Sequence, residues 1–136
     1  MKTKTQDQDH DLEYYMGKLE PEYESKGQEA IGHMLDEYNI PFFYKSPILV
    51  WEDGERGIKR PDFTLSTYNN TVIEYTPLPD ESARKDSRVY KENRIAALFL
   101  KDSDITGPDW KQKLYDKLED IYHQPHNISI DEYRPR

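Results

Sequence analysis

The chain has 136 residues, of which 35% are hydrophobic and 34% charged, and its net charge is −8. This length suits a single domain with a compact core. The absence of cysteine excludes a disulfide framework or thiolate metal site and favours an intracellular, cytoplasmic protein. No apolar run approaches the roughly 20 residues that span a bilayer, so no membrane partner is expected. The N-terminal residues also lack the apolar segment of a secretory signal.

The charge is unevenly distributed along the chain. Residues 56–94 carry eight basic and six acidic side chains, a balance of +2, which leaves −10 on the remainder. An acidic body argues against coating nucleic acid, whereas a locally basic centre suits an enzyme that contacts phosphate at one place. A solvated face of mixed charge is the alternative. The side chains expected to contact nucleic acid are Lys59, Arg60, Arg84, Lys85 and Arg88.

The first clear element is a helix over about 25–38. Residues 1–24 are polar and acidic and are expected to form an arm or a short helix at 11–19. Ser25 and Gln28 then make a capping-box pattern. Apolar residues recur at three- and four-residue steps as far as Tyr38, and Pro41 follows the helix end. Glu29 lies close to the apolar face of this helix.

Three strands are expected next. Aromatic and β-branched residues predict a strand over about 42–50, bent at Pro47, with a turn at Asp53-Gly54 after it. Alternating polarity predicts a second strand over about 60–67 and a third over 71–76. A turn at 68–70 joins these last two strands.

The second half of the chain predicts a helix, a strand and a helix. A charged helix over 82–93 follows the third strand, and the apolar run 95–100 predicts a strand buried on both faces. Pro108 is expected in the first turn of the last helix. A helix between two strands implies that they are parallel, so an α/β fold with a mixed sheet is predicted. The domain would cover 25–123, and 124–136 would be a tail in which residues 128–130 could add an edge strand.

Two carboxylates on neighbouring strands indicate a chemical site. Asp62 begins the second strand and Glu74 lies on the third, on the side away from the core by alternation. Neighbouring strands lie about 5 Å apart, so both side chains can reach one site. Two carboxylates that close repel each other unless a cation lies between them, and Mg²⁺ accepts one or two protein carboxylates while keeping waters for a substrate. Such an ion activates water against a phosphodiester.

The segments Arg60-Pro61-Asp62-Phe63 and Ile73-Glu74-Tyr75, with eleven residues between Asp62 and Glu74, resemble the PD-(D/E)XK nuclease superfamily. The resemblance covers residues 25–105, about 60% of the chain, and implies a restriction-endonuclease-like αβββαβ core. It implies that Asp62, Glu74 and the Tyr75 carbonyl bind Mg²⁺ or Mn²⁺, and that Glu29 holds a metal-bound water or second ion. It also implies a homodimer, in which each subunit cuts one strand.

The chain departs from the superfamily pattern at Thr76. The superfamily has a lysine two residues after the glutamate, where it orients the nucleophilic water. Lys91 on the helix over 82–93 is the expected substitute, ahead of Lys85 and Arg84.

Three functions therefore remain open from the sequence. The first is a Mg²⁺-dependent endonuclease acting on DNA. The second is a catalytically degenerate nuclease fold that binds DNA or a protein partner as an accessory factor, which Thr76 and the net charge of −8 favour. The third is a structural interaction protein that binds its partner through residues 1–24. Ordinary surface roles for the same side chains are the alternative in each case.

Overall fold

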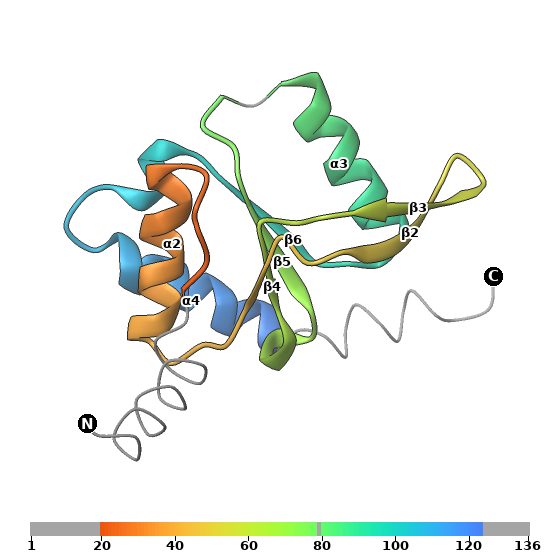
Figure 1. The fold of residues 1–136 in the computed structure, drawn as a ribbon. Coiled ribbons are helices and arrows are strands. Elements are labelled where there is room, and N and C mark those ends of the chain that lie inside the picture. Colours follow the sequence, from red (N-terminus) through yellow and green to blue (C-terminus); the bar gives the residue numbers. More distant parts are fainter. Residues whose placement is uncertain (1–19, 79, 124–136) are drawn as a thin grey trace, which may run out of the picture.

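A computed structural model describes residues 20–78 and 80–123 of the chain (Figure 1). The predicted arm at 1–19 and tail at 124–136 therefore lie outside the described residues. The elements, in chain order, are α2 (Lys26–Glu37), β1 (Phe43–Tyr44), β2 (Ile48–Glu52), β3 (Glu55–Lys59), β4 (Phe63–Leu65), η2 (Ser66–Tyr68), β5 (Thr71–Tyr75), α3 (Glu81–Glu92), β6 (Ala97–Leu100), η3 (Asp102–Ile105) and α4 (Trp110–Tyr122).

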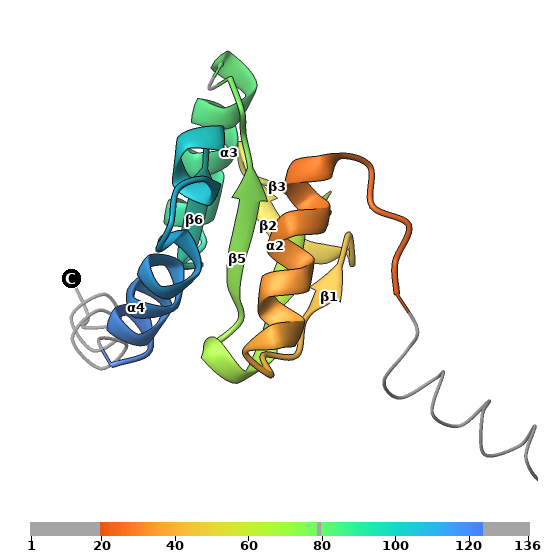
Figure 2. The same cartoon turned by 90° about the vertical axis from the view of Figure 1, so that its left-hand side faces the viewer.

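The central sheet confirms the predicted α/β class and mixed pairing. Its strand order is β1-β4-β5-β6. β4 and β5 are antiparallel, with Phe63 opposite Ile73, and β5 and β6 are parallel, with Ile73 opposite Leu98. Helix α3 supplies the crossover that parallel neighbours require. In Figure 2, α2 lies on one side of β5 and α3 and α4 lie on the other.

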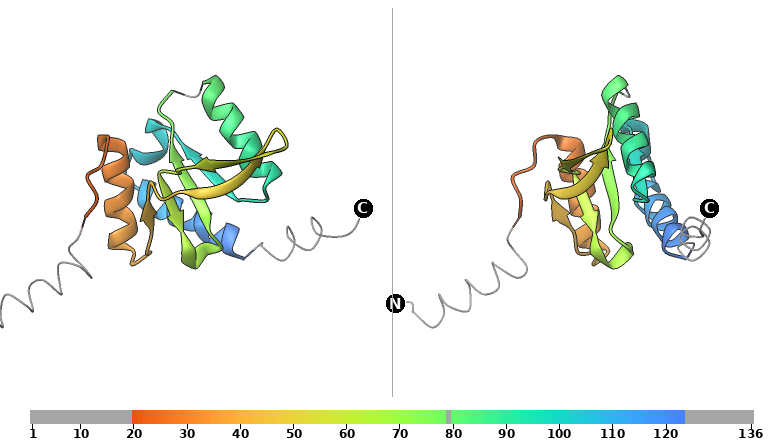
Figure 3. Two further views of the ribbon diagram at one scale, coloured as in Figure 1. Left: turned by 45° about the vertical axis from the view of Figure 1, so that its right-hand side comes forward. Right: turned by 90° about the vertical axis from the view of Figure 1, so that its right-hand side faces the viewer.

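The prediction of one strand over 42–50 is wrong. The chain forms two strands there, β1 and β2, and the Asp53-Gly54 turn leads into β3, which was not predicted. β2 and β3 make a separate antiparallel ribbon, in which Leu49 faces Ile58 and Trp51 faces Arg56. The ribbon runs alongside α3 (Figure 3). Pro47 explains the break, because proline has no N–H to donate to a continuing ladder.

Two further predictions need correction. Residues 95–100 were expected to form a strand buried on both faces, but β6 lies at the edge of the described four-stranded sheet, and only Leu100 in it is buried. Pro108 was expected in the first turn of the last helix, but α4 begins at Trp110 with Asp109 as its N-cap. Among the described helices, none is long and apolar enough to cross a membrane.

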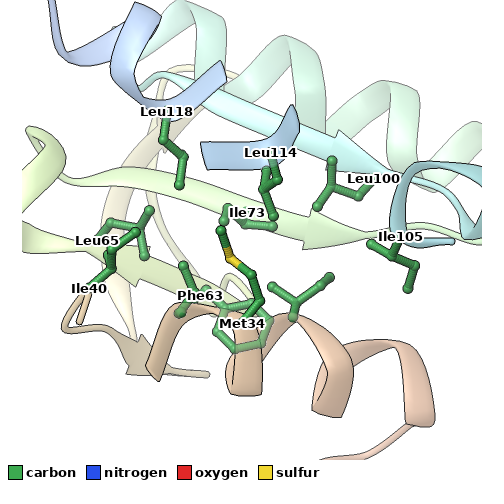
Figure 4. Packing of buried hydrophobic residues seen from close by; sticks show 11 residues of the cluster. Met34, Ile40, Phe63, Leu65, Ile73, Leu100, Ile105, Leu114 and Leu118 are labelled. Carbon is green, nitrogen blue, oxygen red and sulfur yellow. The ribbon is translucent and has the colours of Figure 1, made fainter. Parts of the chain in front are cut away.

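The hydrophobic core forms where α2 and α4 meet the sheet (Figure 4). Met34 of α2, Phe63 of β4, Ile73 of β5 and Leu118 of α4 each have no exposed surface. These side chains come from segments far apart in sequence, so burying them fixes the relative positions of the helices and strands. The core thereby holds the start of β4 and the end of β5 side by side.

Helix α2 begins as predicted and packs closely on β5. The Ser25 side chain accepts a hydrogen bond from the backbone N–H of Gln28 at 3.1 Å. Gln28 reaches back to accept a bond from the N–H of Glu24 at 3.0 Å. Gly27 permits this packing, because a Cβ there would lie 2.1 Å from Cζ of Tyr75. The first turn of α2 is thus held beside the end of β5.

Candidate carboxylate site

Asp62 and Glu74 lie next to each other, as the sequence predicts for residues on paired strands. Asp62 stands immediately before β4, and Glu74 lies on β5, one residue beyond the Phe63–Ile73 pair. The backbone N–H of Asp62 donates a hydrogen bond to Oε1 of Glu74 at 3.2 Å. The two side chains therefore share one end of the sheet, and their charges interact.

Asp62 is surrounded by donors from the protein itself. Its residue is only 4% exposed. Oδ1 accepts a hydrogen bond from Nε2 of Gln28 at 2.9 Å and lies 3.1 Å from Nζ of Lys45. Oδ2 accepts a bond from the backbone N–H of Tyr75 at 2.8 Å. Both carboxylate oxygens are satisfied, which is what burial of a carboxylate requires.

Lys45 supplies the positive charge at this site. Its ammonium lies between Asp62 and Glu24, at 3.1 and 3.3 Å. Burial by itself would lower the pKa of Lys45, but the hydrogen bonds and charges of Asp62 and Glu24 together outweigh burial, so the pKa is raised. The backbone of Lys45 is left-handed, with φ of 59°, and its N–H bonds the carbonyls of Pro61 and Asp62. A left-handed backbone is uncommon for a non-glycine residue, and here it occurs at the residue that contacts Asp62.

Glu74 is held by a tyrosine and has an altered pKa. The Tyr90 hydroxyl on α3 donates a hydrogen bond to Oε2 of Glu74. Burial, with a smaller contribution from the charge of Asp62, raises the pKa of Glu74 to about 7, although the hydrogen bond from Tyr90 opposes this shift. Burial also raises the pKa of Tyr90, which therefore stays protonated and keeps donating. Near neutral pH, Glu74 is thus partly protonated.

The structure does not bring Glu29 or Lys91 to this pair. The Glu29 carboxylate is 44% exposed and lies 4.0 Å from Nε2 of His33, one turn further along α2. The α2 side chain that contacts Asp62 is Gln28. Lys91 lies on the exposed side of α3, and the α3 side chain that contacts Glu74 is Tyr90.

The cations that were expected to contact phosphate are largely paired with acids. Lys59 lies 2.9 Å from Asp86 and 3.6 Å from Glu52. Lys85 lies 3.1 Å from Glu52. Arg84 lies 3.3 Å from Glu81, and the Arg60 guanidinium donates to the Lys45 carbonyl at 3.2 Å. Arg88 is exposed on α3. Glu81 and Asp86 are already counted in the +2 balance of residues 56–94, and Glu52 adds one further negative charge beside Lys59 and Lys85.

Sequence reasoning missed three of the side chains that build the site: Gln28, Lys45 and Tyr90. A signal existed for Gln28, because it precedes Ile31 and Leu35 on the apolar face of α2 and must find a partner when buried. A signal existed for Tyr90 too, because Val89 and Tyr90 are the only large apolar residues between 82 and 93, and a buried tyrosine hydroxyl needs a partner. No sequence pattern pointed to Lys45, since its approach to Asp62 depends on tertiary packing.

The donor set does not fit a divalent ion. Within residues 20–78 and 80–123, no group of three or more acidic or histidine side chains could hold a metal. Magnesium needs open carboxylate oxygens, and those of Asp62 already accept three nitrogen donors. Lys45 beside Asp62, together with the partial protonation of Glu74 near neutral pH, relieves the repulsion between the two carboxylates that an ion would otherwise relieve.

Comparisons with protein-family models, curated proteins and solved structures give no match to this chain.

Proposed function

We propose that this domain is a catalytically degenerate member of the PD-(D/E)XK nuclease superfamily that acts as a non-cleaving accessory factor and binds a protein partner. The observation that carries the proposal is the ammonium of Lys45, 3.1 Å from the buried Asp62 carboxylate. A protein cation there takes the place beside the first acidic residue that a nuclease reserves for its metal.

The rest of the carboxylate site supports the same proposal. Gln28, a neutral side chain, reaches Asp62 from α2, where the resemblance led us to expect a glutamate. Thr76 replaces the lysine that would orient the attacking water, and its N–H continues the sheet by bonding the Leu100 carbonyl. Glu74 has a pKa of about 7, so it is a weaker ligand for a divalent ion at neutral pH. Each feature removes a part that hydrolysis needs.

A protein partner suits the surface better than nucleic acid does. The chain carries a net charge of −8, and Lys59, Arg84 and Lys85 are already paired with carboxylates. A phosphate backbone would have to displace those acids to gain its contacts, which lowers the net attraction.

One observation favours an active nuclease as a second candidate. If a metal ion replaced Lys45 as the partner of Asp62, the ammonium of Lys45 would be free to stabilise the negative charge that develops on the phosphate in the transition state. In that case Lys45, rather than Lys91, would be the substitute for the lysine missing at Thr76.

A cleavage and binding assay separates these candidates. The full chain would be incubated with supercoiled, single-stranded and branched DNA in Mg²⁺, Mn²⁺ or EDTA, beside the Asp62→Asn and Lys45→Gln variants. The proposal expects no metal-dependent cleavage by any of the three proteins and weak DNA retardation that is abolished by physiological salt.

Cleavage by the wild type in Mn²⁺ that is lost in Asp62→Asn would overturn the proposal in favour of the nuclease. Loss of that cleavage in Lys45→Gln as well would identify Lys45 as the substitute lysine. Salt-resistant DNA binding without cleavage would support a catalytically degenerate site, but it would show that the partner is nucleic acid and not a protein.

A further inference from the structure

The β2–β3 ribbon exposes an apolar face that none of the described elements covers. Leu49, Trp51 and Ile58 are 68%, 59% and 61% exposed, whereas Val50 on the opposite face of the ribbon is 2% exposed. The guanidinium of Arg56 lies over the Trp51 ring, 5.9 Å from its centroid. Large apolar side chains gathered on one face of a small ribbon are typical of an interaction surface.

Hydrogen bonding shows which edge of the ribbon is free. Asn93, at the end of α3, accepts a bond from the N–H of Trp51 at 2.8 Å and donates to its carbonyl at 2.9 Å. Both backbone groups of Trp51 therefore point away from β3, so Trp51 and Arg56 form a non-hydrogen-bonded pair. By the alternation of an antiparallel ladder, the backbone groups of Arg56 and Ile58 point away from β2, toward the outer edge of β3.

The outer edge of β3 is unpaired in the part of the chain that the structure describes. The ribbon has two strands only, and no backbone bond from another element reaches Arg56 or Ile58 there. Proline and β-bulges protect many edge strands, and the described β3 has neither; its charged residues Glu55, Arg56 and Lys59 lie on either side of Gly57 and Ile58. A free edge next to an apolar face can accept another strand.

The geometry points to a second copy of this chain as the occupant, with β3 pairing antiparallel to β3 of its partner about a two-fold axis through Gly57. The outward-pointing backbone groups of Arg56 and Ile58 allow three registers with a two-fold axis near the strand centre. An axis at Arg56 places two arginines opposite each other, and an axis at Ile58 places Arg56 opposite Arg60. An axis at Gly57 alone avoids opposing like charges, and it places Glu55 opposite Lys59 of the other copy.

Gly57 fits the centre of this pairing. In this register the two Gly57 residues form a non-hydrogen-bonded pair, in which the Cα atoms lie about 4.5 Å apart and side chains are closest. Arg56 and Ile58 of each copy would then exchange hydrogen bonds with Ile58 and Arg56 of the other. The two apolar ribbon faces would join into one four-stranded surface. This inference is independent of the carboxylate site and of the proposed function.

Cysteine scanning tests the register directly, because the natural chain contains no cysteine. A Cβ at Gly57 meets only ordinary contacts, at 3.8 Å from Val50 and 3.9 Å from Glu52, so Gly57→Cys should fold normally. Two cysteines about 4.5 Å apart between Cα atoms suit a disulfide. Ile58→Cys is the matched control on the same strand, since two such residues would lie about 8 Å apart in this register. Leu49→Cys is a second control, because it would cross-link if two ribbons packed against each other through their apolar faces.

The full-length variants would be oxidised mildly at equal concentration, and dimer formation would be followed on non-reducing gels. We expect Gly57→Cys to cross-link at least tenfold faster than either control, and the wild type to show a concentration-dependent increase of mass in sedimentation. Adding Glu55→Lys should slow the Gly57→Cys reaction about tenfold, because two like-charge pairs replace two opposite-charge pairs. Faster cross-linking by Ile58→Cys or Leu49→Cys, equal rates for all three, or a strictly monomeric wild type would overturn the proposal.

Discussion

Lys45 sets the charge balance around the buried Asp62 carboxylate. It is the cation nearest the Asp62 carboxylate, which is only 4% exposed, and it reaches Asp62 through a left-handed backbone. Removing one partner of a buried ion pair leaves the other charge uncompensated, which costs about 3–5 kcal/mol when both groups are buried.

We expect Lys45→Met to lower the free energy of unfolding by about 1–3 kcal/mol, less than for a fully buried pair because the Lys45 side chain is 33% exposed. Lys111→Met is the matched control, because the Lys111–Glu37 pair is 43% and 57% exposed and should matter by less than about 0.5 kcal/mol. Urea unfolding at pH 7 would measure both. Equal effects would show that Lys45 is an ordinary surface lysine.

Glu74 predicts a specific pH dependence of stability. Its pKa is raised from 4.5 to about 7 in the folded protein, so between these values the folded state binds more protons than the unfolded state. Stability from this group therefore falls as pH rises from about 5 to 8. Glu74→Gln should remove that fall. Between pH 5 and pH 8, the free energy of unfolding should therefore drop by about 2 kcal/mol less in the variant than in the wild type. Urea unfolding at pH 5 and pH 8 tests this, and parallel losses in both proteins would refute it.

At the scale of elements, α2 and β5 are locked together by a glycine. Gly27 is buried in the first turn of α2, and the Tyr75 ring occupies the space where its Cβ would be. In an exposed helix, Gly→Ala stabilises by about 1 kcal/mol. Here the ring or the helix must move, and Tyr75 also donates its N–H to Asp62.

We therefore expect Gly27→Ala to destabilise the protein by about 1–3 kcal/mol, against the helix propensity. A double-mutant cycle with Tyr75→Leu identifies the cause, because shortening the side chain should recover most of the loss. Thermal unfolding of the four proteins provides the measurement. A Gly27→Ala variant more stable than the wild type would show that the Tyr75 ring moves aside at little energetic cost.

The elements also show which parts of the fold are readable from sequence. The cap at Ser25 and the apolar periodicity of α2 are local signals, and both predicted the helix correctly. The strand β3 was missed because Glu55-Arg56-Gly57-Ile58-Lys59 has little β-propensity. It is held in place by pairing with β2, whose Val50 is buried, so tertiary context decided its conformation.

At the scale of the whole molecule, the arrangement of charge matters more than the net count. The sequence showed a basic excess in residues 56–94, but folding places Glu52 and Asp86 around Lys59 and Lys85. Likewise, the pairing of strands put Asp62 beside Glu74 as predicted, whereas Lys45 arrives from a loop seventeen residues earlier. Contacts between paired strands follow from local patterns, and contacts made by loops do not.

The central claim is that a lysine, rather than a metal ion, neutralises Asp62. Paramagnetic line broadening by Mn²⁺, followed at the backbone amide signals of Asp62, Glu74 and Tyr75 at pH 7, tests it most directly. The claim predicts that millimolar Mn²⁺ broadens these three signals no more than amides on exposed acidic helices. Selective broadening at Asp62 and Glu74 in submillimolar Mn²⁺, absent from Asp62→Asn, would contradict it.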